Sequence, residues 1–463
     1  MTHPVPVTPL TLDRTQLEAL AERTTSLMAQ YAVPGVTLGL LTPGGQHELS
    51  FGVTSIEHPL PVTPDTLFQI GSVTKTFVAL AIMRLVERGD LQLDDRVREY
   101  LPDFRLSDQD VAARVTVRQL LNHTAGWAGD HFENTGEGDD ALARMMLSVA
   151  QLPQVTPLGE VWSYNNAAFY VAGRVIEVVT RQTFEAALRD LVLTPLGLDT
   201  SFFFPDEVMT RRFAVGHVIQ GGEPVVARPW GLGRSANAAG GLACSVRDLL
   251  RYAQFHLRDG TAISGARLLS PDSMQVMHTP TVAAAGDRAM AVSWFVHDES
   301  GVRTLMHGGA TNGQMATFQL VPERGFAFVA LTNGDQGEAV YAELTRWIRQ
   351  HLLGLVPVQE EYLQVSADVL HELVGRYVMA GAGDVIEVTT DAEGLLLRMI
   401  EGDYSSIASV PSDPQPPYRA RFYAPDKLVL VDGPYRGTRA DVLRFPDGRL
   451  RWLRKSRVYV PQH

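Results

Sequence analysis

The spacing of apolar residues predicts that this chain alternates helices with strands over most of its length. Between Ser72 and Arg88, apolar residues recur every three or four positions, and Gly89 follows as a stop signal. That period places them on one face of an amphipathic helix. By the same criteria we expect helices over residues 16–31, 166–180, 245–256 and 338–353. Apolar runs bounded by turn signals predict strands over residues 36–41, 49–53, 290–295, 314–320 and 325–331.

The pattern changes after about residue 357. Short apolar alternating runs follow, separated by turn signals such as Pro446-Asp447-Gly448, and they cover residues 374–378, 385–389, 395–400, 420–423, 428–431, 441–445 and 450–453. Close, even spacing without helical segments predicts a small antiparallel barrel or sandwich. We therefore expect two domains, residues 1–356 and 357–463, of which the second folds as a separate unit.

The acidic balance of the chain argues against nucleic acid as a partner. The 463 residues include 40 Lys and Arg against 52 Asp and Glu, a net charge of −12, whereas nucleic-acid binding needs clustered positive charge. A basic cluster near the C-terminus is interpreted as a solvated strand face; it comprises Arg449, Arg451, Arg454, Lys455 and Arg457. Residues 1–25 lack a basic start followed by an apolar run, and no segment is long enough to span a bilayer. We expect a cytoplasmic protein that does not bind membranes.

Neither a metal nor another cofactor is implied by the sequence. Cys244 is the single cysteine, so no intramolecular disulfide is possible, and its small-residue surroundings favour a packing role. No His, Asp or Glu cluster has metal-ligand spacing, and no Gly-rich phosphate loop follows a strand. His123, within Asn122-His123-Thr124, is interpreted as a structural residue bonded within the fold.

Lys75 is unusual because this chain otherwise relies on Arg for positive charge. Only three of its 40 basic residues are lysines. A buried Lys can lose its proton, which Arg cannot do. Lys75 follows Ser72 by three positions, and on a helix this spacing places the amine and the hydroxyl on one face, one turn apart. A neutral amine in that position can take the proton of the serine. Taken alone, however, the tetrapeptide favours a helix cap with a solvated lysine.

Two later motifs change that interpretation. Tyr164 and Asn166 lie in Trp162-Ser163-Tyr164-Asn165-Asn166, and His307 and Gly309 lie in Met306-His307-Gly308-Gly309-Ala310. Taken alone, Tyr164 is typical of a core aromatic residue and His307 of a turn residue. Their order and spacing after Ser72 and Lys75 make the set specific.

In this order the motifs resemble those of the serine β-lactamase / penicillin-binding protein superfamily. The match is closest to the class C β-lactamase-related serine hydrolases, family S12 peptidases and family VIII esterases, and it covers roughly residues 15–355. It implies an α/β (α+β) fold, the β-lactamase/transpeptidase-like fold, in which helices flank an antiparallel sheet beside an all-helical subdomain. The C-terminal region looks like the lipocalin-like β-domain of some relatives, a small all-β barrel that covers the active-site mouth or mediates oligomers.

The resemblance also implies a role for each motif residue. Ser72 is the nucleophile, and Lys75, Tyr164 or both act as general base. Asn166 orients Lys75 and contacts the substrate amide, and His307 begins a strand that lines the cleft. The remaining substrate-binding positions are Gly309 and Ala310, and the N–H groups of Ser72 and Ala310 form the oxyanion hole. Class C β-lactamases have Lys where this chain has His307. A neutral His holds a carboxylate less firmly, which argues against efficient β-lactamase action.

We therefore expect a serine hydrolase that forms an acyl-enzyme with small esters or peptide amides, as D-amino-acid peptidases and esterases do. The alternative is a penicillin-binding-type sensor or scaffold with little turnover, or a weak β-lactamase. The expected partners are a small-molecule or short-peptide substrate and possibly further copies of the chain in a homo-oligomer.

Overall fold

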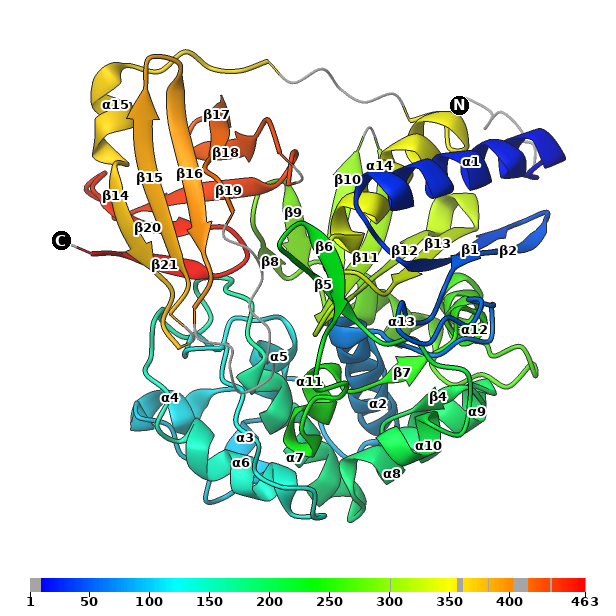
Figure 1. The fold of residues 1–463 in the computed structure, drawn as a ribbon. Coiled ribbons are helices and arrows are strands. Elements are labelled where there is room, and N and C mark those ends of the chain that lie inside the picture. The colour runs from blue at the N-terminus through cyan, green and yellow to red at the C-terminus, as the bar shows by residue number, and fades with distance from the viewer. Residues whose placement is uncertain are drawn as a thin grey trace, which may run out of the picture.

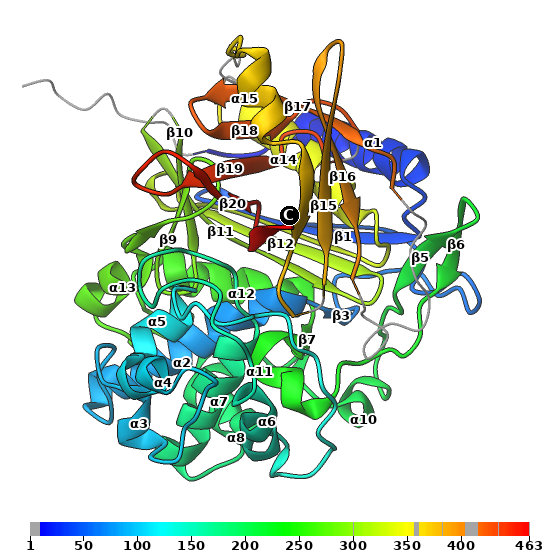
Figure 2. The same cartoon turned by 90° about the vertical axis from the view of Figure 1, so that its left-hand side faces the viewer.

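The chain folds around a large antiparallel sheet, and a barrel lies beside one end of this sheet (Figure 1). The structure is a computed structural model that describes residues 10–299, 301–355, 361–381, 383–402, 415–433 and 435–462. The domain boundary expected at residues 356–357 lies outside the described residues. The sheet and the barrel share no strand, and Figure 2 shows the molecule from the side on which the barrel lies.

The central sheet has eight strands in the order β2-β1-β13-β12-β11-β10-β9-β8. Their bounds are β1 Gly35–Thr42, β2 Gly45–Gly52, β8 Val282–Ala283, β9 Arg288–Met290, β10 Phe295–Glu299, β11 Val302–Thr311, β12 Gln314–Val321 and β13 Phe326–Thr332. β1 is buried along its whole length, as its continuous apolar run predicts, because it lies between β2 and β13. The helices α1 (Arg14–Gln30) and α14 (Gly337–His351) cover one face, and α12 (Val246–Leu257) packs against the other (Figure 1).

Helix α2 (Thr74–Arg88) lies at the centre of the helical region below the sheet (Figure 1). It begins after a 3₁₀ turn, Gly71–Val73, so Ser72 lies immediately before the regular helix. Residues 74–83 are buried on every side, because α7 and α11 pack against α2. The other helices are α3 Val97–Tyr100, α4 Gln109–Arg114, α5 Val117–Leu121, α6 Ala141–Val149, α7 Ala167–Thr180, α8 Phe184–Leu188, α9 Thr194–Leu196, α10 Pro205–Val208, α11 Asn237–Gly240 and α13 Pro271–His278.

Two small sheets complete the body that contains the central sheet. One has the order β3-β7-β4 and the other pairs β5 with β6; the bounds are β3 Phe68–Gln69, β4 Ser201–Phe202, β5 His217–Gln220, β6 Glu223–Val226 and β7 Ala243–Cys244. Cys244 is fully buried in β7, and burial raises the pKa of its thiol. This agrees with the packing role expected for Cys244.

The predicted strand over residues 290–295 is wrong. β9 ends at Met290 and β10 begins at Phe295, and a tight turn connects them, in which the Ala291 N–H donates to the Trp294 carbonyl at 2.8 Å. Ser293 has a φ of +63°, which is a turn conformation rather than a strand conformation. The segment is apolar because its turn is buried, and a short apolar run does not by itself distinguish a strand from other buried structure.

The C-terminal region is a closed antiparallel barrel of eight strands, β14 to β21, in which β21 pairs with β14. The strands are β14 Gly375–Val378, β15 Val385–Asp391, β16 Gly394–Ile400, β17 Tyr418–Ala424, β18 Lys427–Leu430, β19 Arg439–Arg444, β20 Leu450–Arg454 and β21 Val458–Gln462. The expected barrel is therefore confirmed. Strand β21 and the short helix α15 (Ala367–Glu372), which precedes β14, were not predicted.

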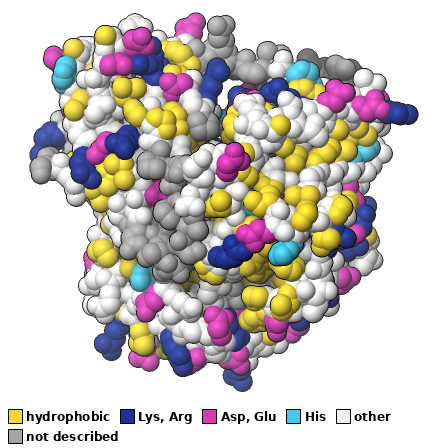
Figure 3. Space-filling view, viewed as in Figure 1, with side chains coloured by type: hydrophobic (Ala, Val, Ile, Leu, Met, Phe, Trp, Pro, Cys, Tyr) yellow, Lys and Arg dark blue, Asp and Glu magenta, His cyan; other side chains and the backbone are white. Residues whose placement is uncertain are grey.

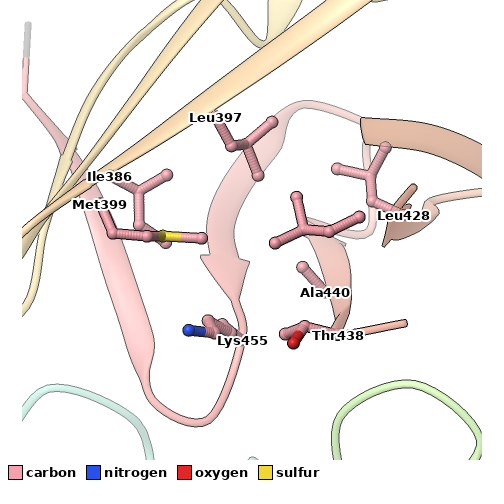
Figure 4. A pocket seen from close by; sticks show the side chains of 8 residues that line it. Ile386, Leu397, Met399, Leu428, Thr438, Ala440 and Lys455 are labelled. Carbon is pink, nitrogen blue, oxygen red and sulfur yellow. The ribbon is translucent and has the colours of Figure 1, made fainter. Parts of the chain in front are cut away.

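Side chains fill the barrel interior. Figure 4 shows apolar side chains from several strands around a small cavity, with Lys455 at its lower edge. The cavity has a volume of about 10 Å³, which is space for one water molecule at most. The described part of this cavity has no room for an organic ligand.

A buried ion pair within the barrel contacts the body that contains the sheet. Arg454 of β20 and Asp441 of the neighbouring strand β19 lie 2.6 Å apart and are both almost fully buried. Arg454 also donates to the Ala284 carbonyl at 2.9 Å, and Asp441 accepts from the Gly286 N–H at 3.2 Å, so these two hydrogen bonds join the pair to the segment between β8 and β9. The interpretation of the C-terminal basic cluster as a solvated face is therefore wrong for Arg454. Alternating arginines have the same pattern whether they face water or a buried carboxylate.

Charges of both signs lie next to one another on the face shown in Figure 3, which shows no continuous basic surface. Of the helices that the structure describes, none is long and apolar enough to cross a membrane. Among the same residues, no group of three or more His, Cys, Asp or Glu side chains is arranged to hold a metal ion.

The ion pair leads to a first prediction. Asp441→Ala leaves the Arg454 guanidinium buried without its carboxylate, and breaking such a pair typically costs about 3–5 kcal/mol. Urea denaturation of the full chain should show this loss. The matched control is Asp447→Ala, because Asp447 forms an exposed pair with Arg449, and such pairs contribute about 1 kcal/mol or less. Equal stability of the two variants would contradict the docking role of Asp441.

Candidate active site

Ser72 and Lys75 lie together where the 3₁₀ turn enters α2. Lys75 Nζ donates to Ser72 Oγ at 3.1 Å and to the Ala239 carbonyl at 2.5 Å. The continuous turn and helix place both side chains on one face, as the three-residue spacing predicts. Ala239 belongs to α11, which packs against α2. The lysine is therefore a buried neighbour of the serine and not a solvated helix residue.

Burial determines the charge state of Lys75. Its side chain has no exposed surface, and this desolvation holds the pKa of the amine well below its ordinary value. The positive charge of Arg457 lowers the pKa further, and the negative charge of Asp130 acts against both. A neutral amine 3.1 Å from a serine hydroxyl can accept its proton.

The ring of Tyr164 lies next to the amine of Lys75. Its ring centroid is 5.1 Å from Lys75 Nζ, and the ring stacks on His123 with the centroids 4.3 Å apart. Burial raises the pKa of Tyr164, while Ser72 and Arg457 act in the opposite direction. The phenol therefore keeps its proton at neutral pH, and of the two candidate bases the structure favours Lys75.

His123 is a structural residue here, as expected. Its Nδ1 accepts from the Asn165 N–H at 3.0 Å, which identifies this nitrogen as the unprotonated one. Burial and the nearby Lys75 hold the pKa of His123 well below its usual value. The neutral ring supports the face of Tyr164 and fixes the backbone beside it.

Asn166 binds a carboxylate that the sequence analysis missed. Its Nδ2 donates to Asp130 Oδ1 at 2.6 Å, and the Asp130 side chain is almost completely buried. Asp130 also forms an ion pair with Arg457 of the barrel, with Arg457 Nε and Asp130 Oδ2 2.7 Å apart. Asp130 lies in a loop without a recognisable motif, and Arg457 is one member of the supposed solvated cluster. Only the fold brings them together.

The third motif runs through the middle of β11. We expected His307 to begin this strand, but β11 starts five residues earlier, at Val302. His307 is buried, and its ring centroid lies 6.1 Å from that of Tyr164. Burial and the nearby Lys75 lower the pKa of His307 to about 3, against an opposing hydrogen bond to the Gly308 carbonyl. The imidazole is neutral at physiological pH.

Two glycines allow β11 to approach the nucleophile. A Cβ on Gly309 would lie 1.8 Å from the Ile70 carbonyl oxygen, which is an impossible distance. Gly71 has a φ of +51°, and a Cβ there would lie 2.6 Å from the Ala310 nitrogen. The main chain that leads into Ser72 is therefore packed directly against the main chain of residues 309–310. Gly309 has this steric role, which the sequence analysis did not distinguish from substrate contact.

Comparison with known proteins identifies the family of this chain. The profile of the family described as Beta-lactamase matches residues 20–353. Penicillin-binding protein 4 of Amycolatopsis lactamdurans is 37% identical over 341 residues, which are 72% of this chain and 90% of that protein.

Similarity to solved structures extends over the barrel as well. The crystal structure of SurE with D-Leu has a TM-score of 0.72 and 25% identity, and it covers 97% of this chain and 100% of that one. The octameric penicillin-binding protein homologue from Pyrococcus abyssi, at 24% identity and a TM-score of 0.65, shares the fold over 96% of this chain and 100% of its own. The family match spans most of the chain and includes all three motifs, and the protein therefore belongs to the beta-lactamase family.

Proposed function

We propose that this protein is a serine hydrolase that cleaves small esters or peptide amides through an acyl-enzyme on Ser72. The observation that carries the proposal is the 3.1 Å contact between Ser72 Oγ and the buried Lys75 amine. A nucleophilic serine needs a base within hydrogen-bond reach. Lys75 meets this requirement because burial favours its neutral form.

The proposed chemistry uses the pair in two steps. Lys75 Nζ takes the Ser72 proton while Oγ bonds to the substrate carbonyl carbon, and the N–H groups of Ser72 and Ala310 stabilise the oxyanion. The leaving amine or alcohol receives a proton from the Tyr164 phenol, which Lys75 reprotonates. Water then attacks the acyl ester, the same groups move its proton, and Ser72 is released as the hydroxyl. One oxyanion-hole donor typically contributes about 3–4 kcal/mol to this kind of transition state.

A cavity of about 280 Å³ is a candidate position for part of a small substrate. Its lining combines apolar side chains, among them Phe132, Phe203 and Leu232, with charged side chains, which are Glu133, Glu137 and Arg234. Of the described residues that line it, none belongs to the three motifs. Asn237 lies two positions before Ala239, whose carbonyl accepts from Lys75.

Substrates of D configuration are the first class to test, because the similar SurE structure was determined with D-Leu. A suitable panel contains p-nitrophenyl esters, D- and L-amino-acid amides and β-lactams, each with small and aromatic acyl groups. Multiple turnovers on an ester or a D-amino-acid amide support the proposal. Covalent labelling by a fluorophosphonate without turnover on the panel supports a penicillin-binding-type sensor instead.

The nucleophile gives the second prediction. Ser72→Ala should abolish covalent labelling by the fluorophosphonate and leave the melting temperature nearly unchanged, since one buried hydroxyl contact is lost and no large cavity forms. Mass spectrometry of the labelled wild-type protein should locate the adduct on Ser72. An adduct on Ser163 or Ser245 would show that the nucleophile is assigned wrongly.

The base gives the third prediction. Lys75→Arg keeps a cation but removes the amine that can lose its proton, so the acylation rate should fall by about 10²–10⁴-fold, the usual contribution of general base catalysis. Because Arg is larger than Lys and can disturb the site by its size, Lys75→Met is the matched variant of similar length. Its acylation rate should fall as far as that of Lys75→Arg. Activity of Lys75→Met close to that of the wild type would leave Tyr164 as the base.

His307 gives the fourth prediction. With a pKa of about 3, this imidazole has no charge at pH 7, so His307→Lys should raise the relative rate on substrates that carry a carboxylate, including β-lactams. The neutral variant His307→Gln is the control for the loss of the ring. Unchanged ratios between carboxylate and neutral substrates in the lysine variant would show that residue 307 does not contact the substrate.

A further inference from the structure

The turn between β20 and β21 of the barrel reaches the active site of the other domain. It carries Arg457, whose Nε lies 2.7 Å from Asp130 Oδ2 and whose Nη2 donates to Asp130 Oδ1 at 3.0 Å. The two residues are separated by 327 positions in the sequence. The Asp130 carboxylate is almost completely inaccessible to water, so a partner of opposite charge is a physical requirement.

Two hydrogen bonds with main-chain donors hold this turn against the Tyr164 motif. The Tyr164 N–H donates to the Ser456 carbonyl at 3.0 Å, and the Val458 N–H donates to Ser163 Oγ at 3.2 Å. In the sequence, Arg457 lies between Ser456 and Val458, which make these two bonds. Arg454 of the same hairpin pairs with Asp441 and donates to the Ala284 carbonyl. The position of the Arg457 guanidinium is therefore determined by the docked barrel.

We infer that Arg457 is a positioning residue of the Ser72 site, supplied by the barrel domain. It acts through two residues that it contacts. It neutralises Asp130, which in turn binds the Asn166 amide at 2.6 Å, and its Cζ lies over the Tyr164 ring, 4.6 Å from the centroid. The inference rests on the proposed acyl-enzyme function of Ser72, and it gives the barrel a part in forming the site.

The charge of Arg457 also favours the reactive protonation states. It lowers the pKa of Lys75 and that of Tyr164, whereas Asp130 raises both. Removal of Arg457 therefore raises the pKa of either candidate base, and removal of the Asp130 charge lowers it. Of the other titratable groups near Lys75, Tyr164 or Asp130, His123 and His307 have lowered pKa values and Tyr170 has a raised one, so all three are neutral at pH 7.

The experiment measures the rate of Ser72 acylation by a fluorophosphonate in the full chain as a function of pH. The base is inactive when protonated, so the rate falls on the acid side of its pKa. In Arg457→Ala this acid limb should move to higher pH, and each unit of movement lowers the rate at a fixed pH about tenfold. In Asp130→Asn the limb should move to lower pH. The double variant should return close to the wild-type position.

Two further variants separate a site effect from a stability effect. Arg457→Lys keeps the charge but loses the planar guanidinium that donates to Asp130 Oδ1 and lies over the Tyr164 ring. This variant should therefore restore the position of the acid limb while recovering the acylation rate only in part. Arg449→Ala is the control, because Arg449 is an exposed barrel arginine, and it should match the wild type throughout. If Arg457→Ala is insoluble, the opposite shift in Asp130→Asn and the result for Arg457→Lys still decide the question.

The outcomes are distinguishable from failure of the proposed function. A wild-type protein that is not acylated at Ser72 contradicts the proposed function itself. A wild-type protein that is acylated, with Arg457→Ala or Asp130→Asn showing the same acid limb, overturns the role of Arg457 alone. A change confined to the KM of carboxylate-bearing substrates overturns it as well, since Arg457 would then be a substrate-binding residue.

Discussion

The buried Lys75 amine is the feature on which the rest of the site depends. An ammonium group without water is unfavourable unless a carboxylate compensates it, and the two groups that accept from Lys75 Nζ here are a hydroxyl and a carbonyl. The neutral amine is therefore favoured, and the free energy for this comes from the packing that keeps water out. This packing consists of helices α7 and α11 against α2 and of the close approach of β11 at Gly309.

The parts that local pattern determines were predicted well. The period of the apolar residues located α2, and the buried run at residues 36–41 located β1, because both elements fill one continuous core. The three motifs identified Ser72, Lys75 and Tyr164, and the structure brings these residues together. The exceptions are also local in origin. Residues 291–294 are apolar because a turn is buried, and period alone does not separate this case from a strand.

The parts that long-range contacts determine were not predictable. Arg454 and Arg457 have the alternation of a solvated strand. The partner of Arg454 is Asp441, 13 residues away on the neighbouring strand, whereas the partner of Arg457 is Asp130, 327 residues away. Nothing in the segment of Arg457 indicates that this distant carboxylate is its buried partner. Asp130 has no motif, and its burial follows from the docking of a domain more than 300 residues away. A sequence reports which side chains can pair, whereas the choice between water and a buried partner depends on the assembled surfaces.

This dependence links the two domains energetically. A buried carboxylate that loses its arginine is strongly unfavourable, so the Asp130 loop is most stable with the barrel in place, and by the same contacts the barrel is most stable against an intact loop. Asp130 also holds Asn166, while the turn that carries Arg457 holds the Tyr164 backbone. Any change that loosens the hairpin therefore changes the charge around Lys75 without altering a motif residue. Under the role proposed for Arg457, sequence changes in the barrel are a route to tuning the pKa of Lys75.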